Sequence, residues 1–151
     1  MKDQDSNRRS QGAEAQSAPS LEPVAPAGWA TPRGYSNGMR VRGASELVFV
    51  AGQIAWDAQQ RLVGAGDFGA QFRQALQNVA DVVRAAGAEP RHVARLTIYV
   101  TDKQRYLASL RDVGAAYREV FGKHFPAMAL VQVADLLEEG ALVEIEATAA
   151  R

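Results

Sequence analysis

The chain has 151 residues, 47% of them hydrophobic, and its 17 basic and 17 acidic residues leave no formal net charge. This composition is typical of one soluble globular domain, and the balanced charge gives no electrostatic reason to expect nucleic acid as a partner. The absence of cysteine excludes disulfides, thiolate nucleophiles and cysteine-ligated metals, and no stretch approaches the roughly 18 apolar residues of a membrane span. We therefore expect a cytoplasmic protein without a membrane segment.

Residues 1–30 are polar at first and then rich in Ala, Pro and Ser, and their apolar residues follow neither a helical nor a strand period. Such a segment buries too little apolar surface to offset the entropy lost on ordering. The sequence therefore predicts a mobile N-terminal tail over residues 1–30 and a compact domain over residues 31–151.

The first half of the domain reads as two strands followed by a helix. Residues 40–41 and 47–54 are predicted strands, joined by a turn around residues 43–46. A helix follows because apolar residues recur at steps of three and four up to Gly87, after which Pro90 forbids continuation. The residues of this apolar stripe are Phe68, Phe72, Leu76, Val79 and Val83.

A third strand and a second helix follow. In VARLTIYVT, residues 93–101, Leu96, Ile98 and Val100 alternate with polar residues, which is the period of a strand. Asp102 is a suitable N-cap for a helix that ends at Gly122. Its inward residues are predicted to be Tyr106, Leu110, Val113, Tyr117 and either Val120 or Phe121.

Two further strands, FPAMALVQV (125–133) and ALVEIEATA (141–149), complete a ββαβαββ order. This order predicts an α+β fold with one sheet and two helices on one face. In residues 125–133 neither side of the strand is charged, and we expect Met128 and Leu130 on the face that the helices leave uncovered. Burying that face requires another copy of the chain, so the sequence predicts an obligate oligomer.

In the last strand Glu144 and Glu146 alternate with aliphatic residues that must face the helices, so both carboxylates share the uncovered face. Two interpretations remain open. The carboxylates belong to a solvated outer face, or one of them lines a pocket between subunits and handles a proton or a water molecule there.

Six segments, in order and spacing, resemble the RidA/YjgF family, also called the endoribonuclease L-PSP family: GYSNGMRV (34–41), VAGQIAWD (50–57), QALQNVADVVRAAGA (74–88), LTIYVTD (96–102), FPAMALVQV and VEIEATA (143–149). The resemblance covers about residues 30–150. It implies a chorismate-mutase-like fold of the bacillus type, assembled as a homotrimer with a barrel-like core and ligand clefts between subunits.

The best-known members of this family hydrolyse reactive enamines and imines, such as 2-aminoacrylate, to 2-oxo acids and ammonia without a metal or organic cofactor. By the resemblance, Glu144 is the catalytic, water-handling glutamate, and Tyr35 and Gln53 match a cleft-closing tyrosine and the glutamine of an SGQ motif. Ala51 stands in place of the serine of that motif. Met128 stands in place of the arginine that binds the substrate carboxylate in the family's FPAR motif.

An arginine binds a carboxylate through two charge-assisted hydrogen bonds, whereas a thioether offers dispersion and a weak acceptor. We therefore expect a homotrimer that binds a small metabolite between subunits without standard 2-imino acid deaminase activity. Met128 then contacts an apolar part of the ligand or simply fills the core. If the protein is an enzyme, we expect a hydrolase or deaminase that acts on imine, enamine or amide-like C–N bonds.

Two alternatives remain. One is an ordinary imine deaminase with a relocated arginine, for which the candidates are Arg33, Arg40, Arg42, Arg105 and Arg111. The other is an endoribonuclease, although the sequence has no dense basic stripe and no base-stacking pattern. His92 and His124 lack a matching set of carboxylates, so we expect no metal site. The expected partners are copies of the same chain and a small molecule, with no nucleic acid and no membrane.

Overall fold

The computed structural model describes residues 18–151, and this part of the chain forms an α+β fold with three α-helices and two sheets. None of its helices is long and apolar enough to cross a lipid bilayer. The elements in chain order are β1 (Ser20–Val24), β2 (Gly38–Arg42), β3 (Leu47–Gln53), α1 (Phe68–Ala85), a 3-10 helix (Pro90–His92), β4 (Val93–Val100), α2 (Lys103–Ala108), α3 (Leu110–Phe121), β5 (Ala127–Gln132) and β6 (Val143–Ala150).

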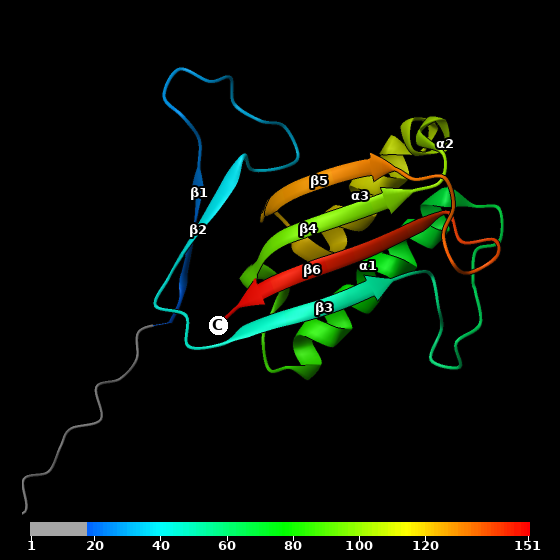
Figure 1. The fold of residues 1–151 in the computed structure, drawn as a ribbon, viewed down its shortest axis with the longest axis horizontal. Helices are drawn as coiled ribbons and strands as arrows, with labels where there is room; N and C mark the ends of the chain where they lie inside the picture. Colours follow the sequence, from blue (N-terminus) through cyan, green and yellow to red (C-terminus); the bar gives the residue numbers. More distant parts are fainter. Residues whose placement is uncertain (1–17) are drawn as a thin grey trace, which may run out of the picture.

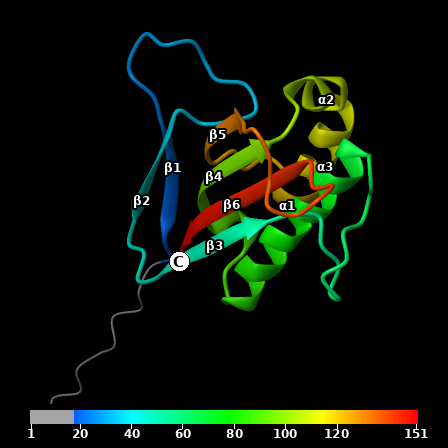
Figure 2. The same ribbon diagram turned by 45° about the vertical axis from the view of Figure 1, so that its right-hand side comes forward.

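Four strands form the main sheet, in the order β3-β6-β4-β5, and the helices cover one face of it. Figure 1 shows this sheet with α1 and α3 behind it, and Figure 2 shows the same two layers from a second direction. Strand β4 runs parallel to β5 and antiparallel to β6. The hydrophobic core fills the space between sheet and helices, and no other element of residues 18–151 covers the opposite face, which we call the uncovered face.

The first predicted helix is confirmed. All five residues of its apolar stripe are buried, the side chain of Asp67 accepts a hydrogen bond from the N–H of Ala70 (3.0 Å), and Gly87 takes the positive φ (74°) that ends such a helix. The second predicted helix is divided in two at Ser109, which departs from helical geometry (φ −103°, ψ 13°). Leu110, predicted to face inward, follows this break and is half exposed.

Strand β1 lies within residues 1–30, whose apolar residues show no strand period. Residues 1–17 lie outside the described residues, but Ser20–Val24 pairs antiparallel with β2, with Leu21 opposite Val41. A two-stranded ribbon that packs little apolar surface needs no alternation of apolar residues, so its sequence carries no strand period. Pro23 is tolerated because, within residues 18–151, one edge of β1 has no partner strand. The division of the chain at residue 30 stays a prediction.

The prediction of a single ββαβαββ sheet is also wrong, because β2 pairs with β1 outside the main sheet. The N–H groups of Ser45 and Glu46 both donate to the carbonyl of Arg151 at 2.8 Å, and the guanidinium of Arg151 bonds the Glu46 carboxylate. These bonds fasten the β2–β3 connection to the end of β6. Strand β3 therefore starts alongside β6 instead of folding back on β2.

Met128 and Leu130 lie on the helix side of the sheet, and the prediction that they face away from the helices is wrong. Met128 pairs with Leu96 and Leu130 with Ile98, and both β4 residues are buried under the helices. Paired residues on neighbouring strands point to the same face, so the register fixes Met128 and Leu130 there. The residues of β5 that alternate with Met128 and Leu130 lie on the uncovered face, and Val131 among them is exposed.

A buried amide on α1 holds two loops in place. The side-chain nitrogen of Gln71 donates to the carbonyls of Gly140 (2.9 Å) and Gly64 (3.3 Å), and its oxygen accepts from the N–H of Leu142 (2.8 Å). Gln71 is fully buried. Because Leu142 directly precedes β6, this amide sets where that strand begins.

We expect the substitution Gln71→Ala to lower the free energy of unfolding by about 2–4 kcal/mol, because the carbonyl of Gly140 and the N–H of Leu142 lose this partner inside the protein, while the carbonyl of Gly64 keeps its bond from the N–H of Asp67. Denaturant unfolding measures this loss. Gln77→Ala is the matched control on the same helix, since Gln77 bonds only the side chain of Asp81, and it should cost less than about 1 kcal/mol. Equal losses in the two variants would contradict the role given to Gln71.

Candidate functional site

Glu144 lies on the uncovered face of the sheet, as predicted, and shares it with Glu146. The aliphatic residues between and beside them are buried against the helices. The carboxylate of Glu144 lies over Gly52, because a Cβ atom placed on Gly52 would overlap it. Ala51, beside this glycine, is exposed on the same face. The structure therefore brings Ala51 and Glu144 to one region.

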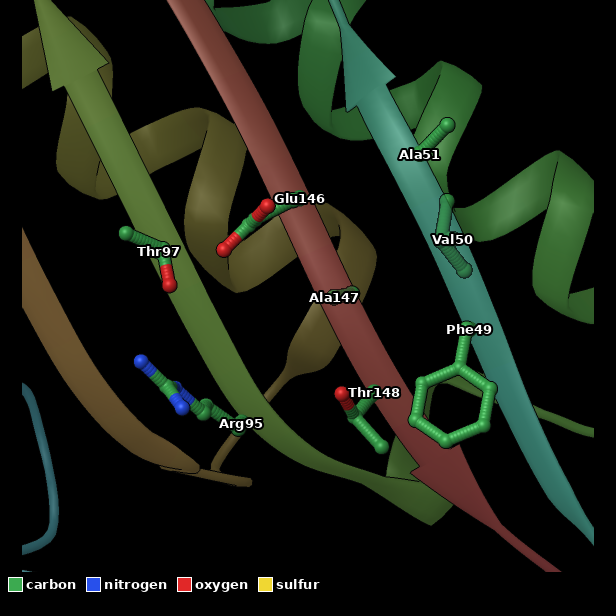
Figure 3. Close-up of a pocket in the computed structure, with 8 residues that line it drawn as sticks. All are labelled: Phe49, Val50, Ala51, Arg95, Thr97, Glu146, Ala147 and Thr148. Carbon is green, nitrogen blue, oxygen red and sulfur yellow. The ribbon is translucent and has the colours of Figure 1, made fainter.

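A concave region of about 400 Å³, which we call the open-face pocket, lies on the uncovered face. Figure 3 shows Arg95 from β4 and Glu146 from β6 on either side of the Thr97 hydroxyl. Thr97 is only 7% exposed, and its hydroxyl oxygen has no hydrogen-bond partner among residues 18–151. The lining residues are Phe49, Val50, Ala51, Arg95, Thr97, Glu146, Ala147 and Thr148.

Tyr99, on the same face of β4, donates a hydrogen bond to the carboxylate of Glu146, which lines this pocket (3.3 Å). Burial, together with the negative charge of Glu146, raises the pKa of Tyr99, so the hydroxyl stays a neutral donor. The uncovered face thus combines a guanidinium, hydroxyls and carboxylates. Such a surface can hydrogen-bond a polar ligand or the surface of another chain.

Arg95 is not among the arginines that the sequence singles out as candidates. Its position on the uncovered face could have been predicted, because Arg95 has the same two-residue period as Thr97 and Tyr99 and alternates with the buried Leu96 and Ile98. Within residues 18–151 Arg95 takes part in no ion pair.

Met128 lines a second concave region of about 400 Å³ on the helix side, which we call the Met128 pocket. Among the described residues, its only charged lining residues are Arg118 and Lys123, and none of the five arginines predicted as substitutes lines it. The lining residues are Gly34, Phe72, Ile98, Tyr106, Leu110, Val113, Gly114, Tyr117, Arg118, Gly122, Lys123, Phe125 and Met128. The pocket is therefore apolar inside and carries positive charge without a carboxylate.

Aromatic stacking makes one wall of the Met128 pocket. The ring of Tyr117 lies parallel to that of Phe125, with centroids 5.6 Å apart, and also stacks on Phe121 at 5.1 Å. The Tyr117 hydroxyl donates to the carbonyl of His124 (2.9 Å), and burial raises the pKa of Tyr117 well above its usual value. This wall is neutral, and Tyr117 is held in it by ring stacking and by the hydrogen bond of its hydroxyl.

Tyr35 lies next to the start of β5. Its neighbour Ser36 donates its hydroxyl to the carbonyl of Phe125 (2.5 Å) and its N–H to the carbonyl of Pro126 (3.0 Å). Tyr35 is exposed and lines a depression with Phe125, while the preceding Gly34 lines the Met128 pocket. The structure thus places Tyr35 beside the Met128 pocket.

Gln53 bonds the backbone of Ala51 but lines neither the open-face pocket nor the Met128 pocket. Its side-chain nitrogen donates to the carbonyl of Ala51 (3.1 Å), and it lines a shallow depression between the end of β3 and α1. Tyr35 and Met128 therefore gather at one edge of the sheet, and Ala51 and Glu144 on its uncovered face. One chain does not bring these two groups together. Within residues 18–151, no three His, Asp or Glu side chains are arranged to hold a metal ion.

These features define an α+β protein with helices on one face of its sheet, acids on the other, and an apolar pocket at the sheet edge. Residues 27–151 match the family model described as Endoribonuclease L-PSP. The 2-iminobutanoate/2-iminopropanoate deaminase of Salmonella typhimurium is 38% identical over 108 residues, which are 70% of this chain and 80% of that protein. The chain belongs to the RidA/YjgF family, as its sequence predicts.

Solved structures agree with this membership. The crystal structure of YyfB from Yersinia pestis, a Rid family protein of unknown function, matches with a TM-score of 0.77 and 33% identity, covering 87% of this chain and 98% of that one. The structure of E. coli TdcF with bound serine matches with a TM-score of 0.60 and 30% identity, covering 82% of this chain and 91% of that one.

We expect Tyr117→Phe to lower the free energy of unfolding at neutral pH by about 0.5–1.5 kcal/mol, since the bond to the His124 carbonyl is lost. The raised pKa gives a second signature. A group with a raised folded-state pKa contributes stability that is present below its ordinary value, about 10 for tyrosine, and is lost as the pH rises through the folded value. Wild type should therefore lose stability more steeply than Tyr117→Phe above about pH 10. Parallel pH profiles in denaturant unfolding would contradict this assignment.

Proposed function

We propose that the protein is a homotrimer that binds a small metabolite in clefts between subunits and lacks the 2-imino acid deaminase activity named for some of its relatives. One observation carries the proposal. The thioether of Met128, in place of the arginine of the family's FPAR motif, lies in a predominantly apolar pocket. Loss of a bidentate, charge-assisted grip reduces the use of a small imino acid by about two to four powers of ten.

The separation of the two groups of site residues supports a cleft between subunits. Met128 is on the helix side of the sheet and Glu144 on its uncovered face. A site that uses both must take them from different copies, with the edge of one sheet near the uncovered face of the next. Phe49, 75% exposed on that face, supports the same arrangement, because a large aromatic side chain gains free energy when another chain covers it.

The relatives support a small molecule as the ligand. The Salmonella protein is named a deaminase of 2-iminobutanoate and 2-iminopropanoate, and the E. coli structure holds serine. If this chain is catalytic, Glu144 handles the water that attacks an imine, enamine or amide-like carbon, and Tyr35 positions the ligand. An imine deaminase with a relocated arginine is the second candidate, and it is favoured by the presence of Arg118 in the Met128 pocket.

The assembly is tested by size-exclusion chromatography with light scattering. We expect the wild type to have the mass of three chains, and Phe49→Glu to dissociate, since it places a charge opposite Thr148 on a face that becomes buried. Leu107→Glu is the matched control, because Leu107 is 51% exposed on the helix side, and it should stay trimeric. A wild-type monomer in dilute solution would overturn the proposed assembly.

The chemistry is tested with freshly generated 2-aminoacrylate in a coupled assay. We expect no turnover above the uncatalysed rate for the wild type. For Met128→Arg, which restores an arginine to bind the carboxylate, we expect a rate about 10- to 100-fold above the uncatalysed one. Glu144→Gln in the Met128→Arg background should abolish this gain. Wild-type turnover that disappears in Glu144→Gln would show instead that the chain is a deaminase.

A further inference from the structure

We infer that Arg118, in the space left by Gly114, is the anion-binding group of the Met128 pocket, and that the pocket takes a carboxylate attached to a bulky apolar group. The inference rests on the proposed function, in which this pocket holds a small molecule, and it names the chemical class of that molecule. The guanidinium comes from α3 and not from β5, where the family's motif has it.

The geometry of α3 places the guanidinium over Gly114. The two residues are four positions apart, and a helical side chain runs back toward the preceding turn. A Cβ atom on Gly114 would lie 3.3 Å from Nη1 of Arg118, so a larger side chain at position 114 would displace the guanidinium. Glycine is unfavourable inside a helix, and here it provides the room that the charged group occupies.

Arg118 has no counterion among residues 18–151. It takes part in no ion pair there, and the adjacent Glu119 is already bonded to Arg73 of α1. Lys123 adds a second cation to the lining, and no acidic side chain of the described chain lines the pocket. Two cations without a carboxylate favour an anionic ligand, and a planar guanidinium matches the two oxygens of a carboxylate.

The rest of the lining specifies the body of the ligand. The thioether of Met128 and the side chains of Phe72 and Val113 offer only apolar contact, and the ring of Phe125 adds an aromatic wall. Tyr106 contributes a hydroxyl that stays a neutral donor, because burial raises its pKa. A cavity of about 400 Å³ is too large for acetate alone, and a neutral aromatic molecule would make no use of the two cations, which are exposed at the pocket.

The test is isothermal titration of the full-length protein with phenylacetate, phenylacetamide and acetate. These probes carry both the ring and the charge, the ring alone, and the charge alone. We expect the wild type to bind phenylacetate about 10- to 100-fold more tightly than either of the others. Arg118→Met should remove the preference for phenylacetate over phenylacetamide and leave the binding of phenylacetamide unchanged, and Arg118→Lys should keep part of the preference.

Arg111→Met is the matched control, because Arg111 is exposed on the same helix and does not line the pocket, and it should behave as the wild type. Equal affinities for the acid and the amide, an unchanged preference in Arg118→Met, or binding of neither aromatic probe would each overturn the inference. Those outcomes leave the proposed function standing, since trimer formation and the absence of imine turnover are measured separately. A monomeric or imine-hydrolysing wild type would overturn the proposed function instead.

Discussion

The arrangement of the site depends on the register of β4 with its two neighbours. Opposite Leu96, β5 places Met128, and opposite Tyr99, β6 places Glu144. Because side chains alternate between the faces of a sheet, these pairings send the thioether toward the helices and the carboxylate toward the uncovered face. A slip of one residue in either pairing would exchange the faces. The two residues that the family resemblance assigns to one site are therefore separated by the thickness of the sheet within a single chain.

This separation gives the two sides of the sheet different chemical characters. The helix side ends at an apolar pocket with two cations, and the uncovered face carries carboxylates, hydroxyls and Arg95 around a buried Thr97 oxygen that has no partner in the described chain. In the proposed homotrimer the edge of one sheet approaches the uncovered face of the next. Positive and negative groups then meet across the boundary, and such complementarity fixes the register of the subunits more than it adds to their affinity.

Much of the fold could be predicted from the sequence, because periodicity and capping are local properties. The stripe of α1, the Asp102 cap and the alternation of β4 and β6 needed no knowledge of distant residues. The face that Met128 occupies could not be predicted, since alternation in an uncharged strand defines two sets of residues without saying which set meets the helices. That choice is made by pairing with β4, some 30 residues away in the chain. Strand β1 could not be predicted for a related reason, because the strand that it pairs with in residues 18–151 is itself exposed.

Arg118 could not be identified from the sequence for a different reason. An arginine on the outer part of a helix has no periodic signal, and only the glycine one turn before it hints that the side chain folds back. Under the proposed function, its position would separate acid recognition from imine chemistry. An arginine on β5 would hold a carboxylate at the edge of the sheet, whereas in the inferred complex Arg118 would hold it from α3, with Met128 left to contact the body of the ligand. In the proposed trimer, a carboxylate held on α3 would direct the adjacent carbon away from the position that the FPAR arginine serves, and a glutamate from a neighbouring copy would no longer be aimed at it.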